Sequence, residues 1–361
     1  MSAYYSGVIA LTVVAMLVMV VTVLRSKVLS PTRKRAFALT FLLIALLAIT
    51  EWLGVFCQAT EGTSRWMHVL SKTLELSVTP FLTLLFAYCF EGRASKAGKV
   101  LGVLFALHVL LEIASGIIGK PGLAFYVDAN DVYHRSTLYL VYVVCDAVGL
   151  IFFFTRAVLL SHSYQNRNLP TLLMCAAVIF AGVVMQFFSP EVRITWITIA
   201  ITAIILFIYL KELVLQVDPV TKILNRLTFD NHINGLRKPA LLIAFDVNKF
   251  KLVNDTYGHS FGDQCLLTVA QTMKEVYGHA GLCFRTGGDV FAVLLERMID
   301  SADELERQFH AKLDAVRATE PRMPYVAVGT ALYRPGEDSV EGAIIRADQM
   351  MYEQKNAYSK R

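Results

Sequence analysis

The stretch C-F-R-T-G-G-D-V-F-A-V-L-L (Cys283–Leu295) has the pattern of a short β-hairpin. Two apolar runs, 282–284 and 290–295, flank Gly287-Gly288, and paired glycines permit the positive φ angles of a tight turn. Asp289 follows the turn, where a carboxylate can serve a phosphate-bound divalent cation as a hard oxygen ligand. Most G-G-D hairpins are only turns, so the meaning of this one depends on the rest of the chain.

The residues around this hairpin, from 214 onward, predict an α/β domain. L-L-I-A-F-D-V (241–247) is typical of a buried strand that carries Asp246 near its end, and a second strand is expected over 324–333. At about 145 residues, the segment is long enough for its own core. Helices are expected over 223–236, 250–257, 260–277, 302–317 and 339–357.

The preceding part of the chain, residues 1–213, is too apolar for a soluble domain. The 361-residue sequence is 55% hydrophobic and 17% charged, with a mean hydropathy of +0.52, and the apolar excess lies before residue 213. A helix needs about 20 residues to cross a bilayer. Seven stretches meet this length, at 5–24, 36–57, 67–90, 100–119, 136–160, 169–188 and 194–213.

Basic residues are concentrated in the loops on one side of these predicted spans, which indicates that this side faces the cytosol. The N-terminus is therefore expected outside and the C-terminal domain inside. The basic side holds Arg25, Lys27, Arg33, Lys34, Arg35, Arg93, Lys96, Lys99, Arg156 and Arg167, and the other side holds only Arg65, Lys120, Arg135 and Arg193.

Four acidic residues fall inside the predicted spans: Glu51, Glu75 and Glu112 in outer halves, and Asp146 near the middle of a fourth span. Ionisable groups are costly in lipid, so these are expected to face the bundle interior. They are candidates for a sensor pocket that takes an unidentified small cationic or hydrogen-bonding ligand, or protons, under the outer loop 124–134. A purely structural network of protonated carboxyl groups between helices is the alternative, and the sequence slightly favours it.

Composition argues against two other kinds of partner. The formal charge of +5 lies largely in short loops between apolar stretches and predicts no nucleic-acid partner. The six cysteines show no zinc-binding spacing.

The last span is expected to continue as the helix Y-L-K-E-L-V-L-Q-V (209–217) up to Asp218, with Pro219 ending it. Leu210, Leu213 and Val217 have the three-and-four spacing of a coiled-coil seam. The connector is therefore expected to transmit movement of the last span to the cytosolic domain.

Four motifs of the C-terminal half together resemble the GGDEF family of diguanylate cyclases. The family reads D-x-L-T-G-L-x-N-R, D-x-D-x-F-K-x-x-N-D-x-x-G-H-x-x-G-D, R-x-G-G-D-E-F and A-D-x-A-M-Y-x-A-K. The corresponding segments here are D-P-V-T-K-I-L-N-R (218–226), D-V-N-K-F-K-L-V-N-D-T-Y-G-H-S-F-G-D (246–263), R-T-G-G-D-V-F (285–291) and A-D-Q-M-M-Y-E-Q-K (347–355).

The resemblance implies a cytosolic domain over 214–361, with a central mixed sheet and surrounding helices, after an all-α seven-helix membrane domain over 1–213. Residues 78–93, which include V-T-P-F-L-T-L-L-F-A-Y and E-G-R, resemble the seven-span sensor module found ahead of some histidine kinases. Together these features place the chain in the bacterial cytoplasmic (inner) membrane as a multipass protein.

The family's reaction joins two GTP molecules into cyclic di-GMP and two pyrophosphates, in a homodimer that here would pair through this domain and the connector. An Asp carboxylate can accept both the N1–H and the amino group of guanine, which explains base choice. The resemblance implies catalytic roles for Asp289, Asp246 and Lys251; Mg²⁺ or Mn²⁺ binding by Asp246, Val247 and Asp289; and GTP binding by Asn254, Asp263, Lys251, Lys355, Gly287 and Gly288.

The sequence departs from the family pattern at the signature itself. Val290 stands where the family has a Glu tied to metal binding and catalysis, and Asn248 replaces the second Asp of D-x-D. Loss of a transition-state carboxylate commonly costs about 100-fold in rate. Two interpretations therefore stay open: a diguanylate cyclase of reduced activity, and a degenerate module that binds GTP or a protein partner and regulates without turnover. A dimerisation scaffold that needs no nucleotide agrees less well with the retained guanine and phosphate positions.

Overall fold

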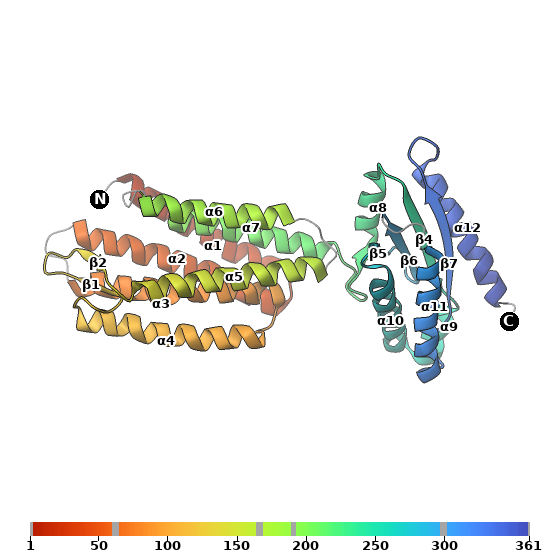
Figure 1. Cartoon of the computed structure of the whole chain (residues 1–361), viewed down its shortest axis with the longest axis horizontal. Helices are drawn as coiled ribbons and strands as arrows, with labels where there is room; N and C mark the ends of the chain where they lie inside the picture. The colour runs from red at the N-terminus through yellow and green to blue at the C-terminus, as the bar shows by residue number, and fades with distance from the viewer. Residues whose placement is uncertain (1–2, 60–64, 164–168, 189–192, 297–301, 360–361) are drawn as a thin grey trace. The chain divides into compact units, whose positions relative to one another are not determined.

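The computed structural model describes residues 3–59, 65–163, 169–188, 193–296 and 302–359, and the chain divides into two compact units between Val214 and Leu215 (Figure 1). Each unit is described by itself below. Arg167, which the sequence places in a basic loop, lies outside the described residues.

The first unit is a bundle of long helices. Six of them are long and apolar enough to cross a membrane, which indicates a multipass membrane protein. The predicted sixth span coincides with α6, and its crossing of the membrane as a seventh span stays a prediction. The bundle helices are α1 (Ala3–Arg25), α2 (Pro31–Ala59), α3 (Arg65–Glu91), α4 (Lys96–Ile118), α5 (Tyr139–Ser163), α6 (Leu169–Phe188) and α7 (Thr195–Leu215).

Small side chains and aromatic contacts hold this bundle together. Gly149 on α5 approaches α3 so closely that an added Cβ would lie 2.2 Å from Thr83 Oγ1. Such small residues allow the close helix contacts on which association in lipid depends. Phe37 on α2 meets Phe207 on α7 edge to face, with ring centroids 5.4 Å apart.

The loop between α4 and α5 contains an antiparallel β-hairpin, which the sequence analysis did not predict. Its strands are β1 (Phe125–Val127) and β2 (Tyr133–Arg135). Asp128 Oδ1 accepts hydrogen bonds from the backbone N–H groups of Asn130 and Val132 and so shapes the turn. Strands of three residues are too short to show period-2 alternation.

The second unit is an α/β domain with a five-stranded sheet in the order β3-β5-β6-β4-β7. Only β3 and β5 run parallel, so the sheet is mixed, as the family resemblance implies. The strands are β3 (Leu224–Asn225), β4 (Ala240–Val247), β5 (Gly281–Arg285), β6 (Val290–Leu295) and β7 (Val326–Tyr333). The helices are α8 (Arg226–Asn234), α9 (Phe250–Tyr257), α10 (His259–Tyr277), α11 (Ala302–Thr319) and α12 (Val340–Ser359).

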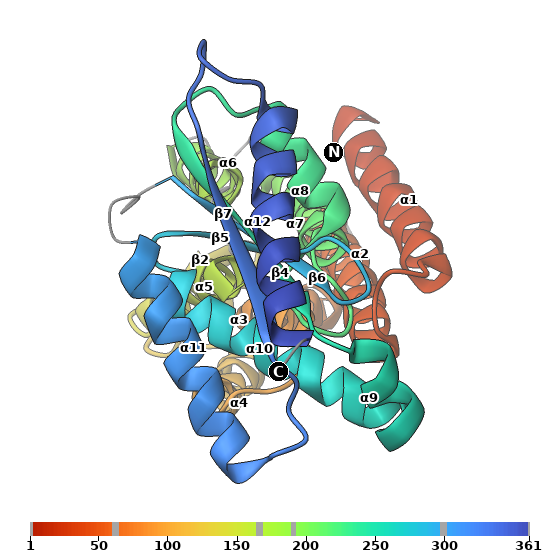
Figure 2. The same ribbon diagram turned by 90° about the vertical axis from the view of Figure 1, so that its right-hand side faces the viewer.

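Strand β4, which lies between β6 and β7, is buried on both faces. Phe245 packs with Tyr277 of α10 and Phe309 of α11 on one face, in the larger core. On the other face, α12 lies along β7 and β4 (Figure 2). Gly329 permits this approach, because a Cβ there would come within 2.2 Å of the Ala347 carbonyl oxygen on α12.

Two predicted helix ends are wrong by a few residues, for one shared reason. The helix predicted from 223 begins at Arg226, and the helix predicted to reach Asp218 ends at Leu215. Asn225 donates its backbone N–H to the Gln216 carbonyl oxygen and its Nδ2 to that of Leu215, and Val217 bridges Leu224. This pairing replaces helical hydrogen bonds on both segments.

Two of the three residues of the predicted coiled-coil seam, Leu210 and Leu213, are not exposed for contact with a second copy. Leu210 and Leu213 are both 0% exposed within the chain itself. Their three-residue spacing therefore reflects burial in one copy, not a surface left open for a second copy.

Candidate active site

The two candidate metal-binding carboxylates belong to a strand and to the turn before its neighbour: Asp246 is on β4, and Asp289 directly precedes β6. Asp246 near the end of β4 stands opposite Val290, the first residue of β6. The Val247 N–H donates a hydrogen bond of 3.1 Å to the Asp289 carbonyl oxygen. The structure therefore brings Asp246, Val247 and Asp289 together where β4 ends and β6 begins, although Asp289 lies more than forty positions from the other two in sequence.

Asp246 is buried and ion-paired. It is 7% exposed, and Lys355 Nζ from α12 lies 2.7 Å from its Oδ1 and 2.8 Å from its Oδ2. Burial raises the pKa of the Asp246 carboxyl, and nearby Asp289 adds to the rise, while the Lys355 ammonium opposes both. Lys355, expected to contact phosphate, thus contacts a metal-ligand candidate in this state.

The oxygen atoms where β4 ends and β6 begins fit a hard divalent cation. Asp246 and Asp289 offer carboxylates, and the side-chain Oδ1 of nearby Asn248 is buried without a hydrogen-bond partner among the described residues. Within the same residues, no group of three His, Cys, Asp or Glu side chains is placed to hold a metal. Mg²⁺ commonly uses one or two carboxylates together with substrate phosphates, so two suffice.

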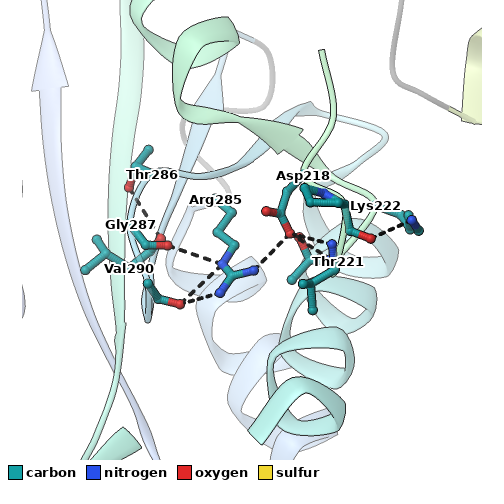
Figure 3. Close-up of polar contacts among 10 residues, drawn as sticks. Asp218, Thr221, Lys222, Arg285, Thr286, Gly287 and Val290 are labelled. Atoms are coloured by element: carbon teal, nitrogen blue, oxygen red, sulfur yellow. Dashed lines mark hydrogen bonds and ion pairs between the residues drawn. The ribbon is translucent and has the colours of Figure 1, made fainter. Parts of the chain in front are cut away.

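Arg285 holds the glycine turn in place. Its guanidinium donates to the carbonyl oxygens of Gly287 and Gly288, at 3.2 Å and 2.6 Å, and to Asp218 Oδ1 at 3.0 Å (Figure 3). The turn also closes through the Thr286 and Gly287 N–H groups, which donate to the Val290 carbonyl oxygen. Arg285 is a positioning residue: it fixes the segment that carries Asp289.

Asp218 stabilises the position of Arg285 through their ion pair. Burial alone would raise the pKa of its carboxyl, but hydrogen bonds from the Thr221 N–H and hydroxyl and the ion pair with Arg285 outweigh burial and lower it. Sequence analysis quoted Asp218 and Arg285 as motif letters but assigned them no role. The only sequence signal that Asp218 and Arg285 pair was that they carry opposite charges in two of the quoted motifs.

The candidate guanine-binding residues lie on α9 and α10. Asn254 packs against Gly262 so closely that a Cβ at Gly262 would lie 1.9 Å from Asn254 Oδ1. Asp263 follows Gly262 and is exposed, as is Lys251 in the first turn of α9. The bare backbone of Gly262 therefore brings Asn254 next to the turn that carries Asp263.

Val290 lines a cavity of about 270 Å³ on the face of the sheet that also carries Asp246. Gly287 from the turn, Phe229 from α8 and Asp348 from α12 contribute to the same cavity. A longer side chain at 290 has room there.

Three of the four acidic residues of the candidate sensor pocket, all but Asp146, have polar partners in the bundle. Glu51 accepts a hydrogen bond of 2.9 Å from the Tyr5 hydroxyl, and Glu75 pairs with Lys72 at 2.7 Å. Glu112 is 0% exposed, and its Oε1 lies 3.5 Å from His108 Nδ1.

Three of these four residues share a neighbour in Tyr139. Glu75, Glu112 and Asp146 are all within electrostatic reach of Tyr139, at the start of α5. Tyr139 in turn packs against the hydrophobic cluster that includes β1.

The family match and the most similar sequences fall on the second unit. Residues 215–361 match the family described as "Diguanylate cyclase, GGDEF domain". Diguanylate cyclase DgcM of Escherichia coli K12 is 31% identical over 148 residues, 38% of this chain and 36% of that protein. A Vibrio cholerae diguanylate cyclase is 30% identical over 122 residues, 33% of this chain and 38% of that protein.

The chain thus spans little more than a third of the length of these relatives. Among solved structures, the GGDEF domain of DgcB from Caulobacter crescentus, in complex with c-di-GMP, is 25% identical with a TM-score of 0.35, and the match covers 39% of this chain and 91% of that one. Residues 215–361 are thus similar to GGDEF diguanylate cyclase domains, and six long apolar helices lie in the described part of the chain before and up to this match.

Proposed function

We propose that this chain is a membrane-bound signalling protein of the diguanylate cyclase type, with turnover lowered by Val290. The adjacent carboxylates of Asp246 and Asp289, beside a backbone-bonded glycine turn, carry this proposal. Such a pair suits a reaction in which negative charge grows on phosphate oxygens.

In the proposed reaction, the 3′-oxygen of each GTP forms a bond to the α-phosphorus of the other, and each bond to pyrophosphate breaks. Asp246, Asp289 and the Val247 carbonyl would hold Mg²⁺ or Mn²⁺, which when bound neutralises phosphate charge and lowers the pKa of the attacking hydroxyl. Asp263 accepts the N1–H and amino group of guanine, with Asn254 beside it, and Lys251 attracts the triphosphate.

Two copies of the domain must face each other for this reaction, because each supplies one GTP. Homodimerisation through the GGDEF domain is therefore part of the proposal. Leu210 and Leu213 are buried within one copy, so a contribution of the connector helix to this homodimer would come from its other residues.

A second function, GTP binding without turnover, is favoured by one specific observation. The residue directly across from Asp246 is Val290, which offers no oxygen to a cation or a phosphate-bound water. In this alternative the domain binds GTP or a protein partner and regulates cyclic di-GMP signalling without turnover.

One assay separates these functions. Purified full-length protein is incubated with GTP and Mg²⁺ or Mn²⁺, and cyclic di-GMP is detected by mass, with Asp289→Ala as the inactive control. Product that disappears in the control supports the cyclase. No product, with GTP binding that Asp263→Ala abolishes, supports the binding module. Absence of both product and GTP binding contradicts both proposals.

The membrane half is proposed as a sensor over residues 1–213, with the output domain over 214–361. It has seven spans in the bacterial cytoplasmic membrane, the N-terminus outside and the GGDEF domain in the cytosol. The carboxylates near Tyr139 support a pocket for a small cationic or hydrogen-bonding ligand under the β1–β2 hairpin.

A further inference from the structure

The helix bundle contains an apolar groove that no role assigned above uses. Its volume is about 350 Å³, within the range of small-molecule sites, and its walls come from α2, α3, α4 and α5. Leu39, Leu43, Phe81, Leu84 and Phe152 line its shaft. Leu39 is 48% exposed, so the groove opens on the outer surface of the bundle, where acyl chains would lie.

One end of this groove is polar and positive. Arg93 and Lys99 line it, both are exposed, and neither side chain has an acidic partner within the described part of the chain. Glu91, the acidic residue in the lining, is already ion-paired with Arg156. The end therefore keeps two uncompensated cations.

This positive end lies at the start of α4, a 23-residue helix capped by Ser95, whose side chain accepts from the Gly98 N–H. The positive end of the helix dipole adds to the attraction for an anion. Arg33 at the start of α2 donates to the Phe90 carbonyl oxygen at 2.6 Å, which places the same end beside the basic α1–α2 loop. On the proposed orientation, this is the cytoplasmic leaflet, which carries anionic lipid.

We propose that this groove binds an anionic phospholipid, with an acyl chain along the shaft and the phosphate between Arg93 and Lys99. The apolar shaft of the groove suits an acyl chain, and its cationic end, at the ends of the spanning helices, suits an anionic headgroup. A soluble anion would contact only the cationic end and would not cover the apolar wall of the groove.

The test is native mass spectrometry of the purified full-length protein in detergent, titrated with phosphatidylglycerol or with phosphatidylcholine of identical chains. Phosphatidylglycerol is expected to bind more tightly. The double variant Arg93→Gln/Lys99→Gln should bind phosphatidylglycerol about 30-fold more weakly, as expected for two near-surface cations, and phosphatidylcholine unchanged.

The matched control removes two exposed cations beyond the opposite end of α4, as Lys120→Gln/Arg135→Gln, and should change phosphatidylglycerol binding by less than about twofold. Leu84→Trp fills the shaft with the cations intact and should weaken both lipids. Equal binding of the two lipids to the unmodified protein, which requires no variant to fold, overturns the proposal. So does an equal loss in the control variant, or displacement of phosphatidylglycerol by glycerol phosphate, which has the charge but no chains.

Discussion

At the residue scale, one side chain decides how much charge the site can hold. Asp246 and Val290 are opposite each other on antiparallel strands, so their side chains point to the same face of the sheet. Asp246 already has a raised pKa because it is buried and lies near Asp289. A carboxylate at 290 would add to this negative site and depend on a bound cation to offset the repulsion.

Val290→Glu should therefore raise cyclic di-GMP formation by about 100-fold, the usual effect of one transition-state group. The increase should need Mg²⁺ or Mn²⁺ and is measured as initial rate at saturating GTP. The matched control is Val290→Gln, which has the same length but no charge and should stay near the unmodified rate. An unchanged rate in Val290→Glu would show that Val290 is not the defect.

The contact between Asn254 and Gly262 gives a second residue-scale prediction. Gly262→Ala would place a Cβ 1.9 Å from Asn254 Oδ1, so the amide must leave its present position. GTP affinity, measured by calorimetry, should fall about 10-fold, as for the loss of a hydrogen bond to a buried polar group. Ser260→Ala, on the exposed side of the same turn, should leave affinity unaltered. Equal affinity in Gly262→Ala would remove Asn254 from the guanine site.

At the element scale, local patterns predicted elements well and their junctions poorly. β4 and the helices α9 to α12 follow from apolar runs and helical spacing that lie wholly inside each segment. The starts of β3 and α8 depend on Asn225 bonding to Leu215 and Gln216, about ten positions away, which no local window contains. The β1–β2 hairpin was missed because its strands are three residues long.

The site shows the same division. The roles of Asp246, Asp289, Asn254 and Asp263 were predicted from motif spacing, which depends on short segments of sequence. The Asp218–Arg285 contact joins residues 67 positions apart and was invisible to spacing, although it holds the turn. The Lys355–Asp246 ion pair was likewise not anticipated, since both residues were assigned to ligands.

The ion pair between Asp218 and Arg285 predicts that the stability of the domain depends on pH. The folded-state pKa of Asp218 is lowered, so its contribution is present above the unfolded pKa of about 4 and is lost as pH falls through the lower folded value. Asp218→Asn should lower the free energy of unfolding of residues 215–361 by about 2 kcal/mol at pH 7, and the difference should shrink at pH values below about 4. Urea denaturation across pH measures it. A difference independent of pH would mean that the carboxylate charge is not the stabilising feature.

At the scale of the whole molecule, the function depends on which side of the membrane each unit occupies. GTP is cytosolic, so the GGDEF domain can act only if the basic loops face inward, as the excess of Lys and Arg there predicts. The native cysteines give little background for testing this with a thiol reagent, because five of the six are buried and Cys145 is half-buried.

Two single substitutions at exposed positions should therefore report topology: Asn130→Cys in the β1–β2 turn and Ser260→Cys on α10. A membrane-impermeant maleimide added to intact cells should label Asn130→Cys at once, and Ser260→Cys only after the membrane is permeabilised. The unmodified protein is the control for background. If Ser260→Cys is labelled in intact cells, the orientation is reversed and the domain cannot reach GTP. If neither position is labelled before permeabilisation, the loop with the hairpin does not face outward, and the candidate sensor pocket beneath it cannot receive an external ligand.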